Sequence, residues 1–355
     1  MPTPSAGYGW LLALFLQRVL LTKIDIKAMR SQKTPVSKRV LSNLGISTKK
    51  FPYLAALRPR QWTKNLIVFA DPLFGFSFNF YTISGSILAF ILFCATSSSF
   101  YLFNDIADVE SDRQHPIKCN RPIAAGLVSI RVAIGMGFVL LSGALIIGWL
   151  RSPSLGATLI GYSLLQIAYN LRLKRTVILD IVAIATGFVL RAYAGAAATG
   201  IVLSSWFLLC TAMLAMFLGV EKRKAELRLM TLRGGKPRSV LKRYSLPLLT
   251  RMESTVTTGA VMTYAIWSSG PNVKGASTPW MLLTLPFVLY GIFRYQLLSD
   301  PDEIARKSNI GVEQGGRSER PEEILLTDLP ILLTVIGWVM TFIVILLLKN
   351  KGLIQ

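Results

Sequence analysis

Charged residues are scarce in this sequence: Asp, Glu, Lys and Arg make up 16% of its 355 residues, whereas hydrophobic residues make up 52%. A soluble domain carries about a quarter charged residues, so the deficit excludes a soluble enzyme. Acidic residues are the scarcer kind, with 18 Asp and Glu against 39 Lys and Arg and a formal net charge of +21. On a soluble surface such a charge would indicate nucleic acid or anionic lipid as the partner. Here the basic residues lie between apolar runs, so we expect a lipid bilayer as the partner and no nucleic acid.

Cysteine and histidine are also rare. The three cysteines, Cys94, Cys119 and Cys210, are too few and too widely spaced for a disulfide framework or a thiolate metal site. Two of them lie inside apolar runs, where a cysteine is typical of a small core residue. The single histidine, His115, excludes a metal site built from several histidines. A Ser-His or Cys-His catalytic pair would depend on that one residue.

Nine apolar segments approach the roughly 20 residues that a helix needs to cross a bilayer. They are residues 65–82, 84–103, 132–150, 155–171, 178–198, 204–220, 246–267, 280–298 and 330–348. Asp71 and Pro72 interrupt the first of them. The sequence therefore predicts an all-α integral membrane protein with about nine transmembrane helices.

Basic residues are unevenly distributed between the connecting segments. If the N-terminus is cytoplasmic, the inside segments hold 33 Lys and Arg and the outside segments hold four. Because positive residues concentrate on the cytoplasmic side, we expect the N-terminus inside and the C-terminus outside, in a multi-pass protein of the plasma (inner) membrane. The acidic residues crowd two of the inside segments, so we expect the active site to face the cytoplasm.

Residues 1–52 are expected to form a basic extension ahead of a transmembrane catalytic domain over residues 53–355. Within the extension, the apolar run 10–21 is too short to span a bilayer and includes Gln17 and Arg18. No small-residue cleavage site follows it, which argues against a signal peptide. An amphipathic helix on an anionic lipid surface is the favoured interpretation; a disordered extension and an early start codon are the alternatives.

The sharpest motif is an acidic run, NDIADVESDR, at the end of the second apolar segment. If that helix continues past the membrane edge, each residue turns by about 100°. One face then carries an amide and three carboxylates, those of Asn104, Asp105, Asp108 and Asp112, and Glu110 points elsewhere. Hard oxygen ligands of this kind are typical of Mg²⁺, which in proteins usually bridges carboxylates and substrate phosphates. The alternative is a solvated acidic helix end, in which the like charges would repel one another.

Several further motifs accompany this run. They are RPRQWTKN at 58–65, DRQHPIK at 112–118, RPIAAG at 121–126, FVLRAYAG at 188–195, SWFL at 205–208 and KRKAEL at 222–227. The pattern Asn-Asp-x-x-Asp-x-x-x-Asp in a nine-span bundle resembles the UbiA superfamily of intramembrane prenyltransferases. The accompanying motifs are similar to its decaprenyl-phosphate phosphoribosyltransferase branch, the decaprenylphosphoryl-ribose 5-phosphate synthases. The resemblance covers about residues 53–348.

This resemblance implies a UbiA-like bundle that transfers the 5-phosphoribosyl group from 5-phosphoribosyl 1-diphosphate to a membrane polyprenyl phosphate of decaprenyl type. Pyrophosphate is released, and Mg²⁺ is the implied cofactor. We expect Asn104, Asp108 and Asp112 to bind the metal, and Asp105, Asp108 and Asp112 to act in catalysis. The expected substrate-binding residues are Arg58, Lys64, Arg121, Lys174, Arg191, Lys222, Arg223 and Glu226. Whether the protein forms an oligomer stays open.

Several of these basic residues also have a simpler interpretation. Arg58, Lys64 and Lys174 are equally typical of positive anchors at the inner edge of a membrane. Arg191 differs, because it lies within the fifth apolar segment together with Asp180, and ionisable residues at membrane depth usually face a polar cavity. A buried structural ion pair is the alternative for Arg191.

The segment after the sixth apolar run separates two enzymatic hypotheses. In the aromatic prenyltransferases of the superfamily this loop carries a second aspartate-rich motif, whereas residues 221–226 here read EKRKAE, with three bases and two acids. A basic loop facing a Mg²⁺ site suits a substrate with an additional phosphate, and it leaves the number of bound metals open. The alternatives are a UbiA-type prenyltransferase acting on an aromatic or other small acceptor and, from another class, a transporter or channel. A transporter or channel would have charges along a path near mid-membrane, whereas this chain concentrates its acids at one face.

Overall fold

The computed structural model describes residues 51–74, 79–115, 118–233, 240–300 and 328–354, and these residues form helices joined by turns, with no strand among them. The all-α prediction is confirmed. The chain divides into residues 1–55 and 56–355. Of the first unit only residues 51–55 are described, within helix α3 (Pro52–Ala56). The amphipathic helix expected over residues 10–21 lies outside the described residues.

The second unit contains eight long helices among its described residues. They are α5 (Phe80–Ala107), α7 (Ile130–Arg151), α8 (Pro153–Leu171), α9 (Leu179–Thr199), α10 (Ser205–Arg233), α11 (Leu246–Ser268), α12 (Leu285–Ser299) and α15 (Leu329–Asn350). Shorter elements connect them: η2 (Pro59–Phe69), α4 (Ala70–Phe74), α6 (Val109–Arg113), η3 (Lys118–Asn120), η4 (Leu173–Arg175), η5 (Leu241–Arg243), η6 (Pro271–Val273) and η7 (Pro279–Thr284). The η elements are 3₁₀ helices.

Polar N-cap side chains set where several helices begin. Asn79 accepts the backbone N–H of Thr82 at 2.8 Å, so α5 begins at Phe80, earlier than the expected position 84. Ser152 caps α8 in the same way, and Pro153 follows at the first helical position, where its missing N–H costs nothing.

The first apolar segment, expected as a helix over residues 65–82, has a different form in its described part. It is the 3₁₀ helix η2 followed by the short helix α4. Pro72 explains the break, because a proline in a helix interior removes a hydrogen bond and clashes with the preceding turn. In α4 it falls in the first turn, where it is tolerated.

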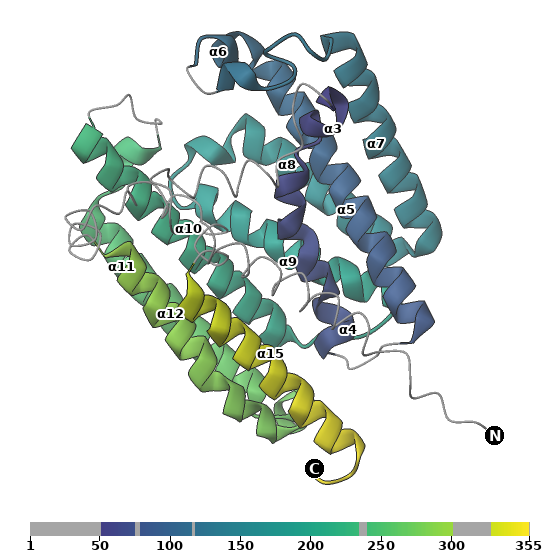
Figure 1. The fold of residues 1–355 in the computed structure, drawn as a ribbon, viewed down its shortest axis with the longest axis vertical. Coiled ribbons are helices and arrows are strands. Elements are labelled where there is room, and N and C mark those ends of the chain that lie inside the picture. The colour runs from purple at the N-terminus through teal and green to yellow at the C-terminus, as the bar shows by residue number, and fades with distance from the viewer. Residues whose placement is uncertain (1–50, 75–78, 116–117, 234–239, 301–327, 355) are drawn as a thin grey trace, which may run out of the picture. The chain divides into compact units, whose positions relative to one another are not determined.

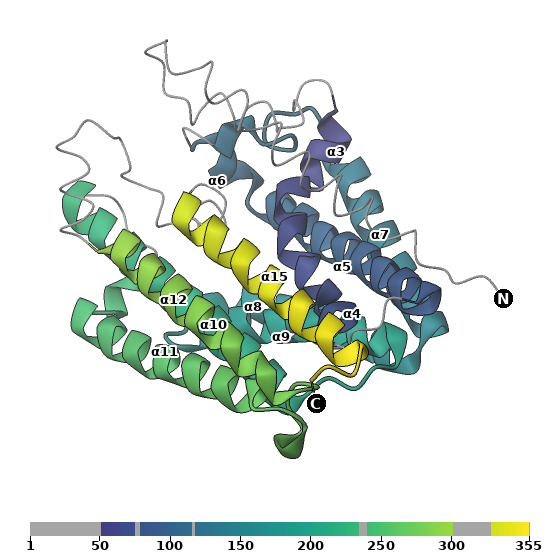
Figure 2. The same ribbon diagram turned by 60° about the horizontal axis from the view of Figure 1, so that its bottom comes forward.

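Six described segments are long and apolar enough to cross a membrane. They are α5, α7, α9, α10 as far as Arg228, the stretch Pro279–Ser299 and α15. Helices α5 and α8 pack against both α7 and α9, α9 packs on α10, and α10 packs on α11. Figures 1 and 2 both show α10, α11, α12 and α15 as a second group beside α5, α7, α8 and α9.

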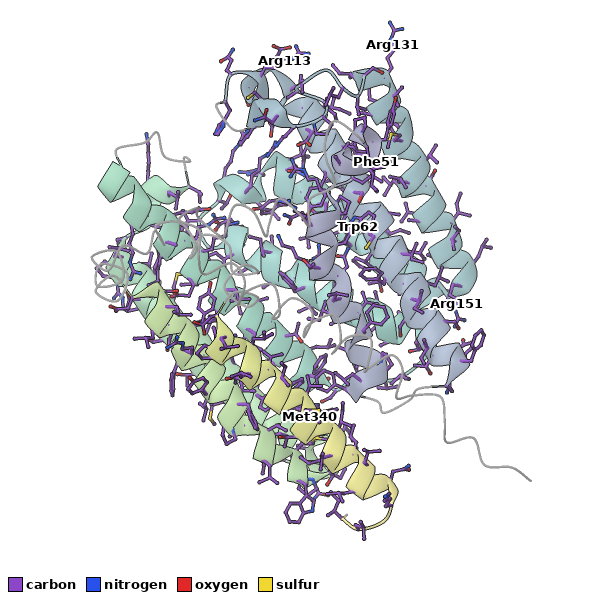
Figure 3. All side chains as sticks on the ribbon, in the orientation of Figure 1. Phe51, Trp62, Arg113, Arg131, Arg151 and Met340 are labelled. Carbon is purple, nitrogen blue, oxygen red and sulfur yellow. The ribbon has the colours of Figure 1, made fainter. Side chains whose placement is uncertain are left out.

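Three labelled arginines mark the two ends of the helix bundle. Arg113 of α6 and Arg131 at the start of α7 lie at one end, and Arg151 lies at the other end of α7 (Figure 3). The acidic run belongs to the end that carries Arg113.

Candidate active site

The acidic run keeps a helical repeat through a local break. Helix α5 continues to Ala107, and α6 begins two residues later. The backbone N–H of Asp108 donates to Asn104 O at 2.9 Å, and that of Asp112 donates to Asp108 O at 2.8 Å. The expected extension of this helix beyond position 103 is therefore confirmed, with a break at Asp108.

Two of the expected catalytic carboxylates are buried against arginines. Asp105 is 3% exposed and Asp112 is 1% exposed. Arg121 Nη1 donates to Asp105 Oδ1 at 3.1 Å and to Asp112 Oδ2 at 2.5 Å. Arg58 Nη2 donates to the same oxygen of Asp105. We call Arg58, Asp105, Asp112 and Arg121 the carboxylate cluster; it brings together four residues that the sequence placed in the site.

Arg58 reaches this cluster from a rare backbone conformation. Its φ of 55° and ψ of 59° lie in the left-handed region, which is unfavourable for a residue with a side chain. The guanidinium stacks over the ring of Tyr101, 5.1 Å from its centroid. The ion pair with Asp105 and this stacking hold Arg58 in place.

The fit of a metal ion can be tested on the oxygens of the acidic run. Among the described residues no group of three or more His, Cys, Asp or Glu side chains is placed to hold a metal by itself. Asp112 Oδ1 is nevertheless buried without a hydrogen-bond partner, with Lys118 Nζ 3.8 Å away. Asp108 is exposed, and Asn104 lies one helical turn before it. These hard oxygens fit an ion such as Mg²⁺ that completes its coordination with substrate phosphates and water.

A cavity of about 620 Å³, the polar cavity, lies between η2, α5, α8, α9 and α10. Its polar and charged lining residues are Thr63, Lys64, Tyr101, Asn104, Gln166, Tyr169, Asn170, Arg191 and Lys222. Four residues expected in the site therefore come together here: Lys64, Asn104, Arg191 and Lys222. The described lining holds three cationic side chains and no carboxylate, so the cavity suits a ligand with several negative charges.

Arg191 is held within the bundle by neutral groups. Its Nε donates to Asn65 Oδ1 at 2.7 Å, Nη1 donates to Gly187 O at 2.8 Å, and Nη2 donates to Tyr162 Oη at 2.7 Å. The alternative of a buried ion pair with Asp180 is wrong, because Asp180 binds Arg223 instead, at 2.8 Å.

The sequence predicted a basic loop at residues 221–226. That prediction is wrong, because these residues lie inside helix α10. Lys222 lines the polar cavity, but Arg223 donates to Asp180 and to Glu226, at 2.8 and 2.6 Å. Lys224 binds Glu221 at 2.9 Å and Glu253 of α11. Successive helical residues point in directions about 100° apart, so Lys222 can line the cavity while Arg223 and Lys224 bind acids on other sides of the helix.

Arg223, Glu226 and Lys174 line neither of the cavities described here. Arg223 and Glu226 belong to a network with Asp180 and Tyr244. Tyr244 donates to Asp180 Oδ1 at 2.7 Å. Burial, followed by this hydrogen bond, raises the pKa of Tyr244, so the phenol stays protonated as a donor. Lys174 is half-buried in η4.

A polar stripe on α8 was not predicted from the sequence. Tyr162 binds Arg191, and Gln166, Tyr169 and Asn170 line the polar cavity. Their spacing of four, three and one residues places them on one helical face. Polar residues at helical spacing within an apolar span were the signal that would have found them.

A second cavity of about 440 Å³, the apolar cavity, lies between α4, α9, α10, α11, α12 and α15. Aromatic side chains form much of its wall, among them Phe74, Phe207, Trp267 and Trp338. Four residues line both cavities, namely Ile67, Phe188, Ala215 and Leu218. The polar and apolar cavities therefore adjoin.

Residues 74–310 match the sequence profile of the UbiA prenyltransferase family. The chain belongs to the UbiA prenyltransferase family. Membership of this family and the six apolar helices identify an integral membrane protein.

Two relatives of this UbiA protein share most of its length. It is 35% identical over 301 residues to a decaprenyl-phosphate phosphoribosyltransferase of Mycolicibacterium smegmatis, a match that covers 81% of this chain and 90% of the relative. It is 37% identical over 295 residues to the enzyme of the same name from Corynebacterium glutamicum, covering 81% and 84%. The fold is similar to a UbiA homologue from Archaeoglobus fulgidus bound to GPP and Mg²⁺, with a TM-score of 0.59 and 17% identity, covering 82% of this chain and 98% of that one.

Proposed function

We propose that this protein transfers the 5-phosphoribosyl group from 5-phosphoribosyl 1-diphosphate to a membrane polyprenyl phosphate of decaprenyl type and releases pyrophosphate. The observation that carries the proposal is the 35% and 37% identity to two decaprenyl-phosphate phosphoribosyltransferases over most of both chains. The polar cavity supports it, because three cationic side chains and no described carboxylate line it. Cationic donors of this kind bind phosphate oxygens strongly.

The chemistry of the step makes few demands on the protein. The bond between ribose C1 and the pyrophosphate oxygen breaks, and its electron pair leaves with the pyrophosphate. An oxygen of the acceptor phosphate forms the new bond to C1, and displacement inverts that carbon. The acceptor is already an anion, so no general base is needed. The role of the protein is to hold both anions in line and to neutralise their charge.

Each group of side chains then has a task. Lys64 and Lys222 bind phosphates of the donor in the polar cavity, which Asn104 also lines. Arg58 and Arg121 hold Asp105 and Asp112 in position through their ion pairs. Asn104, Asp108 and Asp112 would hold Mg²⁺, which when bound neutralises the leaving pyrophosphate. The Mg²⁺ in the Archaeoglobus fulgidus homologue supports this choice of metal.

The apolar cavity receives the first part of the polyprenyl chain. Its wall is almost wholly apolar, and it adjoins the polar cavity at Phe188 and Leu218. Burial of a hydrocarbon chain in such a space is favourable. With the chain in the apolar cavity, the acceptor phosphate would lie in the polar cavity, where the two cavities adjoin.

We place this site on the cytoplasmic side of the plasma (inner) membrane, in a chain that spans it nine times with the N-terminus inside. The 33 to four distribution of basic residues supports this orientation. In it, residues 53–355 form the catalytic domain and residues 1–52 a basic extension.

The proposal is tested with the purified full-length protein in detergent with Mg²⁺. One reaction contains a polyprenyl monophosphate and 5-phosphoribosyl 1-diphosphate; the other contains a prenyl diphosphate and an aromatic acid. We expect mass spectrometry to show a phosphoribosyl gain on the lipid in the first reaction, abolished by EDTA. A prenylated aromatic product in the second reaction alone would refute the proposal.

A further inference from the structure

We propose that Arg191 binds the phosphate of the polyprenyl acceptor, so that the deep end of the polar cavity is an acceptor subsite separate from the donor phosphates. The inference rests on the proposed function, because it takes a lipid phosphate as one of the two substrates. In this proposal the buried side chain of Arg191 recognises the lipid phosphate substrate.

Arg191 is buried without a carboxylate partner in the part of the chain that the structure describes. The side chain is 6% exposed, and its three bonded partners are an amide oxygen, a backbone carbonyl and a phenol. The rings of Tyr162 and Phe188 lie 4.8 and 5.4 Å from its guanidinium carbon. Among the described residues no carboxylate forms an ion pair with it. A buried charge without a counter-ion is costly, so a ligand anion in the cavity is the natural partner.

Arg191 lies at one end of the helical face that lines the polar cavity. On α9 the cavity is lined at residues 183, 184, 187, 188 and 191, one face of the helix. Arg191 is the last of these, about 18 Å along the helix from Leu179 at 1.5 Å per residue. Its ring contact Phe188 lines the apolar cavity as well. The cation thus lies where the two cavities meet.

A ligand that fills both cavities needs an anionic group and an apolar part. An anion bound to Arg191 has an apolar cavity of about 440 Å³ beside it. The donor, 5-phosphoribosyl 1-diphosphate, has no apolar part to place there, whereas a polyprenyl monophosphate has both a phosphate and an apolar chain. The donor then occupies the rest of the polar cavity, which Asn104 and Lys222 line.

The test separates recognition of the phosphate from recognition of the chain. Binding of farnesyl monophosphate and of farnesol to the purified full-length protein is measured by ligand-induced thermal stabilisation across a concentration series. We expect the wild-type protein to bind the phosphate at least tenfold more tightly than the alcohol, because charge-assisted hydrogen bonds contribute roughly that much or more.

Two variants then address Arg191 itself. Asn65→Asp is nearly isosteric. Because Arg191 Nε lies 2.7 Å from the Asn65 side-chain oxygen, this substitution places a carboxylate beside the guanidinium. Arg191→Gln removes the charge. Both are expected to lose most of the preference for the phosphate, roughly tenfold or more, while binding of farnesol stays within twofold. Arg131→Gln, an exposed arginine at the start of α7, is the matched control and keeps the preference.

Steady-state kinetics give a second readout. With Asn65→Asp, the KM for the polyprenyl phosphate is expected to rise at least tenfold while the KM for 5-phosphoribosyl 1-diphosphate changes less than twofold. A rise in the donor KM instead, or an unchanged preference for phosphate over alcohol in both variants, would overturn the inference. If the wild-type protein shows the Arg191-dependent preference but no phosphoribosyl transfer, the acceptor subsite stands and the proposed function fails.

Discussion

Two acidic residues of the same run, Asp112 and Glu110, have opposite surroundings although they lie two positions apart. Asp112 is 1% exposed and binds Arg121, whereas the Glu110 side chain is 79% exposed and pairs with Arg113 at 3.1 Å. Asp112→Asn is expected to lower turnover about 100-fold, the order of loss seen when a group that stabilises transition-state charge is removed. Glu110→Gln makes the same change in net charge and is expected to stay near the wild-type rate. Equal rates for the two variants, measured at saturating Mg²⁺, would remove Asp112 from the site.

Arg58 allows a test of backbone strain at a single residue. Its φ of 55° is accessible to glycine at little cost but costs a residue with a side chain about 1 kcal/mol. Arg58→Gly and Arg58→Ala both lose the ion pair with Asp105, so they differ mainly in this strain. We expect the glycine variant to unfold at the higher temperature in detergent. The reverse order would show that the left-handed conformation is not retained.

At the scale of elements, the charged turn of α10 assigns different roles to neighbouring lysines. Lys222 lines the polar cavity, whereas Lys224 lies between the buried carboxylates of Glu221 and Glu253. Lys222→Met is expected to raise the KM for 5-phosphoribosyl 1-diphosphate with little change in melting temperature. Lys224→Met leaves two buried carboxylates without their cation and is expected to destabilise the fold by about 3 kcal/mol or more. Steady-state kinetics and thermal unfolding of both variants test whether Lys222→Met acts mainly on the KM and Lys224→Met mainly on stability.

The start of α9 is fixed by a second network. Ile178 precedes the helix with a φ of 70°, rare for a β-branched residue, and its N–H donates to Tyr244 Oη at 2.7 Å. Tyr244→Phe removes that acceptor and the donor to Asp180, and is expected to cost about 1–3 kcal/mol of stability. Because its pKa is raised in the fold, the contribution is present at neutral pH and is lost only as the pH rises above about 10, the ordinary value. Tyr290→Phe, an exposed tyrosine of α12, is the control expected to leave thermal unfolding at pH 7 unchanged.

The sequence predicted the limits of some helices well, but it did not predict which side chains pair between helices. The apolar segments of α7 and α9 lie within two residues of the expected limits, because a long uninterrupted apolar run has few alternatives. Residues 221–226, EKRKAE, were expected to form a loop because they are charged and follow an apolar run. Inside the helix Arg223 and Lys224 pair locally with Glu226 and Glu221, and each also binds a carboxylate from outside this turn. Those partners, Asp180 and Glu253, come from other helices, and sequence spacing carries no information on that contact.

The candidate site shows the same limit. The spacing of the acidic run placed Asn104, Asp105, Asp108 and Asp112 on one helical face, and their role at a metal stays a prediction. Asn65 and Arg191 are 126 positions apart, and only the fold brings them into contact. Which cations face the polar cavity and which pair with acids is likewise a property of the packed bundle.

At the scale of the whole molecule, the orientation in the membrane can be measured directly. Ser111 of α6 and Asn272 of η6 are both exposed. We expect Asn272→Cys to react with a membrane-impermeant maleimide in intact cells, and Ser111→Cys to react only after permeabilisation. Cys119→Ser provides the background, because Cys94 and Cys210 are buried. Labelling in the reverse pattern would place the acidic run outside the cell.

The central claim is that the phosphoribosyl group, and not the pyrophosphoryl group, moves from the sugar donor to the lipid. The most direct measurement uses 5-phosphoribosyl 1-diphosphate labelled with ³²P either at the 5-phosphate or at the β-phosphate of the diphosphate, together with a polyprenyl monophosphate. The account predicts that the 5-phosphate label enters the lipid fraction and that the β-phosphate label stays in the aqueous phase as pyrophosphate. Entry of the β-phosphate label into the lipid, or of neither label, would contradict it.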